Sequence, residues 1–149
     1  SVNEIIEKAH KKGLRIFFNP APYSISVNNY SIEKVNTLIY NETEGQRLSG
    51  EKDYKEIIKT LSNKYPNTRQ ILTLGKRGSI YSFDKNTIKV KAESVKTIDS
   101  TAAGDTYIGY YVSSLSKKIS VEESMKIASK AASIATTIVG GANSIPKIN

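Results

Sequence analysis

The chain has 149 residues, and 22 lysines and arginines against 14 aspartates and glutamates give it a formal net charge of +8. It has no cysteine and one histidine, His10, which excludes disulfide scaffolds, zinc fingers, iron–sulfur sites, cysteine nucleophiles and histidine-rich metal centres. No apolar run approaches the roughly 20 residues that a membrane span needs, and the N-terminus does not resemble a secretory signal. We therefore expect a cytoplasmic protein of about one domain, with no membrane partner.

Helices and short strands alternate along the first half of the chain. Apolar residues at helical spacing, ended by Gly13, predict the first helix. The next apolar run is rich in strand-forming residues and stops at Asn19-Pro20, because proline cannot continue a ladder. The elements predicted in this half are a helix within residues 1–12, strands at 14–18 and 37–40, and helices at 42–48 and 54–65.

The second half begins with residues 70–74, a nearly continuous apolar run typical of a strand buried in a parallel sheet. Short pieces at 80–83, 87–90 and 94–96 predict a hairpin or meander. A helix is expected at 103–116 and another at 120–139, where Ser120 and Glu123 have the spacing of a capping box and Gly140-Gly141 ends the pattern. The alternation predicts an α/β fold, a three-layer α/β/α sandwich with a mostly parallel sheet, formed by residues 1–149 as a single unit.

Residues 99–106, Asp-Ser-Thr-Ala-Ala-Gly-Asp-Thr, combine small side chains with a predicted helix start. Backbone N–H groups and the positive end of the helix dipole meet there, which favours an anion site. An aspartate in a first helical turn can simply complement the dipole. Beside an anion site, however, Asp105 is placed as a general base that removes a hydroxyl proton during phosphoryl transfer.

This segment resembles the C-terminal signature of the ribokinase-like (PfkB) carbohydrate kinases, and three further segments agree with that family in order and spacing. Phe18-Asn19-Pro20-Ala21-Pro22 is similar to its Asn-Pro-Ala-Pro run, and Asn41-Glu42-Thr43-Glu44 to its Asn-x-x-Glu motif. Residues 71–78 are similar to its nucleotide-binding strand and turn. The resemblance implies the C-terminal half of the ribokinase-like fold and ATP-dependent phosphoryl transfer to a sugar hydroxyl, with ribose as the expected substrate.

Roles for individual residues follow from the resemblance. Asp105 would be the base that contacts the substrate, and the N–H groups of Ala103, Gly104 and Asp105 would form the anion hole. Asn41 would act near the phosphates, and Glu44 would bind Mg²⁺ through water. The nucleotide-binding set is completed by Thr73, Gly75, Lys76, Gly78 and Ser129, although the family usually has Asn or His at the position of Ser129.

The resemblance also implies a site for a monovalent cation, expected to be K⁺, formed largely by carbonyl oxygens beside the anion hole. The residues at the corresponding positions are Asp99, Thr101, Ala135, Ile138, Gly140 and Ser144.

Simpler interpretations of single motifs stay open. Asn41-x-x-Glu44 by itself is a helix cap with acidic first-turn residues, and Thr73 by itself only ends a strand. Lys76 and Arg77 are equally typical of a solvated turn. His10 is expected on the surface of the first helix. Three tyrosines on the helix after the signature are expected to be packing residues rather than base-stacking platforms: Tyr107, Tyr110 and Tyr111.

Ribokinase-like enzymes are about twice this long, and the segments that select the sugar in that family have no counterpart here. We therefore expect the isolated chain to be an inactive fragment, lacking the N-terminal sugar-binding and lid part, of a kinase that forms a homodimer. Fructose, a nucleoside or a pyridoxine-like compound are alternative substrates. A basic binding module is the rival class, but the lysines and arginines are scattered among acidic residues, so we expect no nucleic-acid partner.

Overall fold

The structure is a computed structural model, and it describes residues 1–93, 95–96 and 102–138. It divides the chain into two compact units. The first unit contains Ser1–Thr73 and Ile80–Ile88, and the second contains Leu74–Ser79 together with the described residues from Lys89 onward.

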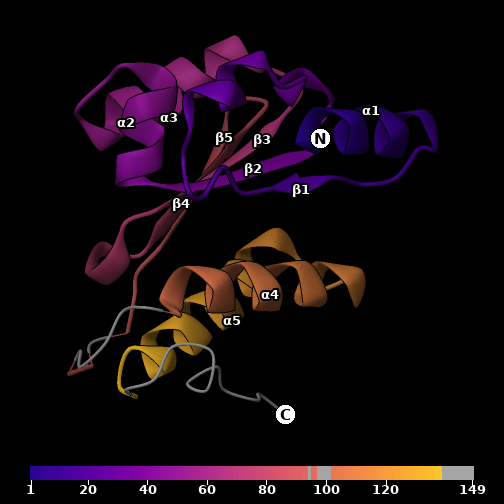
Figure 1. Cartoon of the computed structure of the whole chain (residues 1–149). Helices are drawn as coiled ribbons and strands as arrows, with labels where there is room; N and C mark the ends of the chain where they lie inside the picture. The colour runs from indigo at the N-terminus through magenta and orange to yellow at the C-terminus, as the bar shows by residue number, and fades with distance from the viewer. Residues whose placement is uncertain (94, 97–101, 139–149) are drawn as a thin grey trace. The chain divides into compact units, whose positions relative to one another are not determined.

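Five strands form a sheet in the described part of the chain, in the order β1-β2-β3-β4-β5 (Figure 1). β1 runs parallel to β2, and β2 runs parallel to β3 with Leu38 opposite Gln70 and Asn41 opposite Thr73. Parallel neighbours joined by helices are the pattern of an α/β fold, as predicted. The strands are β1 (Phe17–Phe18), β2 (Thr37–Asn41), β3 (Arg69–Thr73), β4 (Ser79–Phe83) and β5 (Asn86–Val90).

The helices follow the predicted order. Ser1 and Asn41 each close a capping box at a helix start, and Gly50 ends the second helix in the left-handed conformation. The α-helices are α1 (Val2–Lys11), α2 (Glu42–Ser49), α3 (Tyr54–Lys64), α4 (Ala103–Ser116) and α5 (Val121–Ala135). Three short 3₁₀ helices are η1 (Ile25–Asn29), η2 (Ile32–Lys34) and η3 (Gly75–Arg77).

The core of the first unit lies around β2 and β3. The β2 side chains before Asn41 and the central side chains of β3 are buried, as expected for parallel strands covered on both faces. The helices α2 and α3 lie side by side and contact these strands (Figure 1). Gly45 of α2 allows this packing, because a Cβ there would lie 2.7 Å from Ile57 Cγ2 and 3.0 Å from Tyr40 Cδ2.

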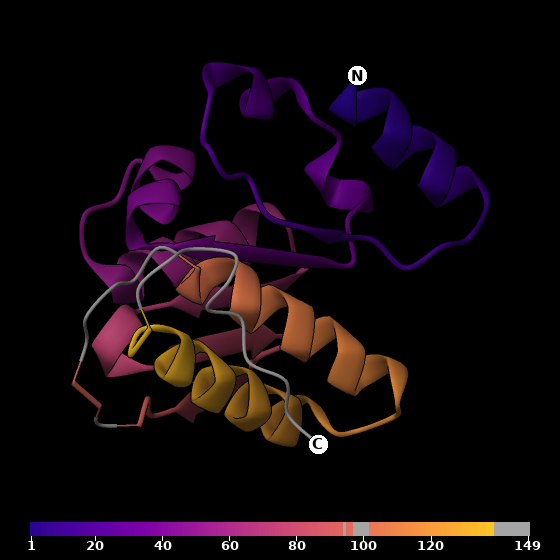
Figure 2. The same ribbon diagram turned by 60° about the horizontal axis from the view of Figure 1, so that its bottom comes forward.

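In the second unit, α4 and α5 pack against each other along their lengths (Figure 2). Small side chains of α5 fill the contact, with Ala128 and Ala131 fully buried beside Met125. Tyr107 and Tyr111 of α4 are buried and stacked with ring centroids 6.3 Å apart, so the prediction that they are packing residues is confirmed. The α5 helix begins where Ser120 Oγ accepts a hydrogen bond from the Glu123 N–H.

Three predicted boundaries are wrong. The strand predicted at 14–18 contains only Phe17 and Phe18, because the Leu14 N–H still bonds to Ala9 and the Ile16 N–H bonds to the Asn36 side chain instead of a ladder partner. Residues 95–96 do not form the expected third β piece. The last helix ends at Ala135, where the hydroxyls of Thr136 and Thr137 bond back to carbonyls of the preceding turn.

No helix within residues 1–93, 95–96 and 102–138 combines the length and the apolar character that crossing a membrane requires.

Candidate functional site

Three polar residues of the first unit lie at the carboxyl ends of its parallel strands. Asn19 directly follows β1, Asn41 is the last residue of β2, and Thr73 is the last residue of β3 and lies opposite Asn41. Thr73 Oγ1 donates to the Tyr40 carbonyl at 3.5 Å. Since open α/β sheets bind ligands at the carboxyl ends of their strands, this edge is the candidate site of the first unit.

Asn41 and Glu44 hold each other in a capping box at the start of α2. Asn41 Oδ1 accepts from the Glu44 N–H at 2.9 Å, and Glu44 Oε2 accepts from the Asn41 N–H at 3.0 Å. The simpler interpretation, a helix cap, is therefore what the geometry shows. It also has a consequence for chemistry, because the cap holds the carboxylate of Glu44, a residue that is only 8% exposed, at the strand ends.

Asn19 completes this cluster, and the sequence analysis did not include it among the site residues. Its Nδ2 donates to the Ile39 carbonyl at 2.8 Å and lies 3.5 Å from Glu44 Oε2. The signal for it was present, since Asn19 opens the Asn-Pro-Ala-Pro run. Within the described residues, the side-chain oxygen of Glu44 that contacts Asn19 and Asn41 is Oε2 in both cases, which leaves Oε1 for another partner.

In the second unit, residues 74–78 form a tight turn after β3. The Leu74 N–H donates to the Gly78 carbonyl at 2.7 Å, and Gly75 and Gly78 have φ values of +57° and +89°. A Cβ on Gly78 would lie 1.9 Å from the Val90 carbonyl oxygen, so only glycine fits there. Lys76 is exposed on this turn, and the predicted residues Gly75, Lys76 and Gly78 are thus brought together.

The first turn of α4 carries Ala103, Gly104 and Asp105. Its N-cap, Ala102, has no side-chain oxygen to accept their N–H groups, and an α-helix provides no internal acceptor for its first N–H groups. Gly104 and Asp105 are exposed, and no described atom lies within 4 Å of where a Gly104 Cβ would be. Backbone donors, the positive end of the dipole and a carboxylate are therefore together at one accessible helix start.

A buried hydrogen bond joins this helix start to the glycine turn. Tyr107 Oη and Ser79 Oγ lie 2.8 Å apart, and Ser79 directly follows Gly78. Burial raises the pKa of Tyr107 to about 12, and the bond to Ser79 offsets part of that rise. Tyr107 therefore stays protonated at neutral pH and holds the turn and the first turn of α4 in one arrangement.

The remaining predicted residues are more dispersed. Ser129 is buried on α5 at 6% exposure. Ala135 ends α5, its carbonyl accepts from the Ile138 N–H at 3.4 Å, and Ile138 is 43% exposed. Asp99, Thr101, Gly140 and Ser144 lie outside the described residues. Within the described residues no three His, Cys, Asp or Glu side chains gather as a metal-binding group.

The whole chain resembles known proteins. Residues 1–148 match the model of the pfkB family carbohydrate kinases. The ribokinase of Staphylococcus aureus is 34% identical over 146 residues, which are 95% of this chain and 47% of that protein. The structure of the ribokinase of Thermotoga maritima has a TM-score of 0.81 and 27% identity, covering 97% of this chain and 50% of that one.

The Arabidopsis thaliana ribokinase, solved in complex with ribose and ATP, has a TM-score of 0.87 at 22% identity, covering 97% of this chain and 49% of that one. The fold is therefore the predicted ribokinase-like α/β fold, and the chain spans about half the length of the curated relatives it matches. With a family match over essentially every residue, the chain belongs to the pfkB family of carbohydrate kinases.

Proposed function

We propose that this chain provides the nucleotide-binding and phosphoryl-transfer half of an ATP-dependent sugar kinase whose substrate is ribose. The observation that carries the proposal is the start of α4, where an exposed carboxylate, Asp105, lies beside backbone N–H groups that lack an acceptor within the helix. The family match and the ribokinase relatives support the reaction class and the sugar.

Asp105 is the proposed base. Its carboxylate takes the proton of the sugar hydroxyl while that oxygen forms a bond to the γ-phosphorus of ATP, and the bond from that phosphorus to the bridging oxygen of ADP breaks. The N–H groups of Ala103, Gly104 and Asp105 stabilise the negative charge of the transferred group, as preorganised donors do in other transfer reactions.

The glycine turn is the proposed nucleotide contact. Gly75 and Gly78 keep side chains away from a ligand, Lys76 supplies an exposed positive charge, and the bond between Ser79 and Tyr107 fixes this turn against the start of α4. Asn41, Thr73 and Ser129 complete the proposed nucleotide set. Ser129 has the weakest support, because it is buried.

Glu44 fits the Mg²⁺ that the family implies. Mg²⁺ retains water and uses one or two carboxylates together with substrate phosphates, and Glu44 offers one oriented carboxylate with Oε1 outside the cap. When bound, Mg²⁺ would neutralise phosphate charge. For K⁺, the proposed ligands stay those that the resemblance implies: Asp99, Thr101, Ala135, Ile138, Gly140 and Ser144.

Titration of the chain with ATP tests the nucleotide site. We expect weak binding that needs Mg²⁺, weakened about tenfold by Lys76→Ala, a loss typical of one charged contact. Glu44→Gln is the sharpest variant, because glutamine at this position still closes a capping box but carries no charge. It should leave the melting temperature unchanged and remove the advantage of Mg²⁺ over EDTA. Equal ATP binding by wild type and Lys76→Ala would contradict the nucleotide site.

The base is tested in a completed kinase, in which the unmatched half of the Staphylococcus aureus ribokinase is joined ahead of Ser1. The isolated chain should show no ribose turnover, since it spans about half the length of its relatives. In the completed enzyme, Asp105→Ala should lower kcat by about a thousandfold, within the range of general-base catalysis. Retained turnover would show that Asp105 is not the base. A separate titration with DNA and RNA at several salt concentrations tests the rival hypothesis of a basic binding module.

A further inference from the structure

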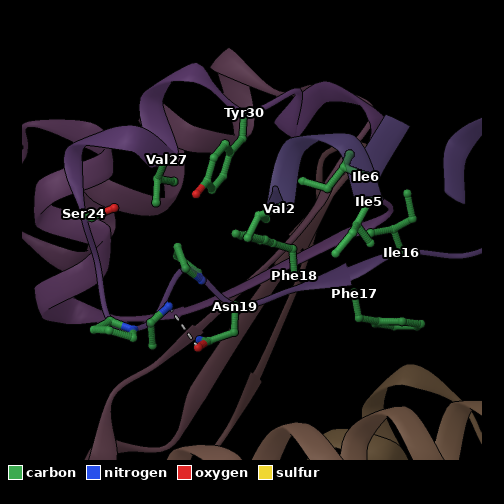
Figure 3. A pocket seen from close by; sticks show the side chains of 13 residues that line it. Val2, Ile5, Ile6, Ile16, Phe17, Phe18, Asn19, Ser24, Val27 and Tyr30 are labelled. Atoms are coloured by element: carbon green, nitrogen blue, oxygen red, sulfur yellow. Dashed lines mark hydrogen bonds between the residues drawn. The ribbon is translucent and has the colours of Figure 1, made fainter. Parts of the chain in front are cut away.

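Contacts between near neighbours in sequence orient polar side chains at the strand ends of the first unit. Asn19 Oδ1 accepts from the Ala21 N–H at 3.2 Å, the contact drawn as a dashed line beside a hollow between α1 and β1 (Figure 3). Asn41 and Glu44 cap each other across three positions. Side chains held in this way are oriented by their own segment of the chain.

The first turn of α4, which carries Asp105, lacks this kind of local support. Its N-cap, Ala102, forms no side-chain cap, and no described atom lies within 4 Å of where a Gly104 Cβ would be. The Thr106 hydroxyl is buried, yet no described group forms a hydrogen bond with it. Because uncapped helix ends fray, an ordered first turn here needs support from another element.

Tyr107 supplies that support. Its hydroxyl lies 2.8 Å from Ser79 Oγ, 28 positions earlier in the chain, and both residues are buried, at 4% and 2% exposure. Among the described residues it is the one side-chain hydrogen bond that ties residues 102–107 to another element. Breaking such a bond is costly, because each buried hydroxyl would be left without a partner.

The Ser79 end of this bond is fixed by the glycine turn, which also carries Lys76. The turn is closed by two backbone hydrogen bonds, from the Leu74 N–H to the Gly78 carbonyl at 2.7 Å and from the Gly78 N–H to the Gly75 carbonyl at 3.0 Å. Since Ser79 directly follows Gly78, a displacement of the turn also displaces the hydroxyl that Tyr107 contacts.

The Tyr107 end is constrained as well. Its ring stacks on that of Tyr111, which is fully buried, with 6.3 Å between the centroids and 13° between the planes. The Thr106 N–H donates to the Ala102 carbonyl at 2.9 Å, so the backbone just before Tyr107 already follows the helix. A shift of the Tyr107 hydroxyl therefore also moves the backbone of Asp105, two residues earlier.

We propose that Tyr107 is a positioning residue of the phosphoryl transfer, which through Ser79 makes the placement of Asp105 depend on the state of the glycine turn. A nucleotide that orders the turn then also orders the first turn of α4. The inference rests on the proposed function, which assigns the turn to the nucleotide and Asp105 to the base. Tyr107 is buried, so its role is to orient Asp105 and not to contact a substrate.

Hydrogen exchange of the chain with and without MgADP tests the proposal. ADP lacks the γ-phosphoryl group that the proposed anion hole stabilises, so slower exchange at the start of α4 would have to come through the protein. In the wild type, MgADP should slow exchange at residues 74–79 and also at residues 106–109. The second effect should be about two- to tenfold, because the coupling cannot exceed what one hydrogen bond contributes.

Three variants separate a positioning role from a purely structural one. Tyr107→Phe and Ser79→Ala each leave one buried hydroxyl without its partner, and each should lower the melting temperature. The double variant has neither hydroxyl, so it should regain much of the lost stability. If the bond only stabilised the fold, the double variant would respond to MgADP like the wild type. We expect instead that MgADP slows exchange at 74–79 in all three variants and no longer does so at 106–109.

Tyr23→Phe is the control, because the Tyr23 hydroxyl contacts only Asn28 among the described side chains and lies at the surface. It should leave both effects of MgADP unchanged. The proposal is overturned if the double variant keeps the slowing at 106–109, or if the wild type shows slowing at 74–79 alone. Absence of slowing at 74–79 in the wild type would overturn the nucleotide assignment of the turn, and this inference with it, so the two failures are distinguishable.

Discussion

The turn after β3 places Gly78 where a side chain cannot be accommodated. With φ at +89° and ψ at −142°, its backbone is in a region that costs other residues about 1–3 kcal/mol. A Cβ would also lie 1.9 Å from the Val90 carbonyl oxygen and 2.9 Å from the Ala92 backbone nitrogen. Displacing packed backbone costs about 1–3 kcal/mol more, so Gly78→Ala should destabilise the chain by about 2–6 kcal/mol.

Gly75→Ala is the control for this prediction. Gly75 also has a positive φ, +57°, but no described atom lies within 4 Å of its Cβ position. Backbone strain of about 1–2 kcal/mol is partly offset by the lower entropy of the unfolded alanine chain. The steric cost of about 1–3 kcal/mol separates the two variants. In urea denaturation followed by circular dichroism, with m about 2 kcal/mol/M, Gly78→Ala should therefore lower the midpoint by about 0.5–1.5 M more than Gly75→Ala. Equal midpoints would refute the steric argument.

Three further predictions concern stability and ionisation. Gly45→Ala should destabilise the chain by up to about 2 kcal/mol, because the new Cβ would meet Ile57 and Tyr40. Gly109→Ala, whose Cβ would lie in open space, should stabilise the chain by about 0.5–1 kcal/mol. Thermal melts in which both variants are stabilised would contradict the close packing at Gly45. Tyr107→Phe should lower the free energy of unfolding by about 1–3 kcal/mol, because it leaves the buried Ser79 hydroxyl without its partner, whereas Tyr23→Phe at the surface should change it little. In an ultraviolet titration, Tyr107→Phe should also remove the tyrosine that ionises near pH 12. The hydrogen bond from Lys34 lowers the pKa of Glu7, and one from Ser31 lowers it further. Glu7 therefore stabilises the fold above its unfolded pKa near 4.5, and this contribution is lost as the pH falls through the lower folded pKa. Melting temperatures of Glu7→Gln should accordingly change less than those of wild type between about pH 5 and pH 3.

Local sequence signals predicted most helix ends. The predicted limits of α4, 103–116, are those observed, and α2 extends one residue beyond the predicted 42–48. At α2 such signals act within one turn of the chain, through the Asn41 side chain, which accepts a nearby N–H, and through Gly50, which adopts the left-handed conformation. Such features can be recognised without knowing the tertiary structure.

Signals that depend on distant residues were less informative. The run at 14–18 has strand-forming residues, but Asn36, 20 positions away, takes the Ile16 N–H and shortens the strand to Phe17 and Phe18. The short helices η1 and η2 have no periodic pattern long enough to detect, and neither was predicted. The end of α5 depended on whether the threonine hydroxyls would bond back to the helix.

The candidate site likewise has features that the sequence indicates and features that depend on contacts between distant residues. The resemblance to the pfkB family points to Asn41, Glu44 and the glycine turn as candidate site residues. The contacts that orient them join residues far apart in sequence, Asn19 to Glu44 across 25 positions and Ser79 to Tyr107 across 28. Sequence alone gives no way to choose among the rotamers that make or break such contacts.

The cap and metal interpretations of Asn41-x-x-Glu44 are compatible, and the geometry explains why one motif can serve both. A carboxylate that only caps a helix needs one oxygen, and Glu44 uses Oε2 for that purpose. An exposed, unrestrained glutamate would have to lose side-chain entropy on meeting a hydrated cation, a cost of up to about 1.5–2 kcal/mol. In Glu44 the cap and burial at the end of β2 have already met that cost during folding. A helix cap at the carboxyl end of a parallel strand therefore holds a carboxylate in a preorganised position. Glutamine could form the same cap, so binding of a cation at this edge would depend on the negative charge of Glu44 and not on the cap itself.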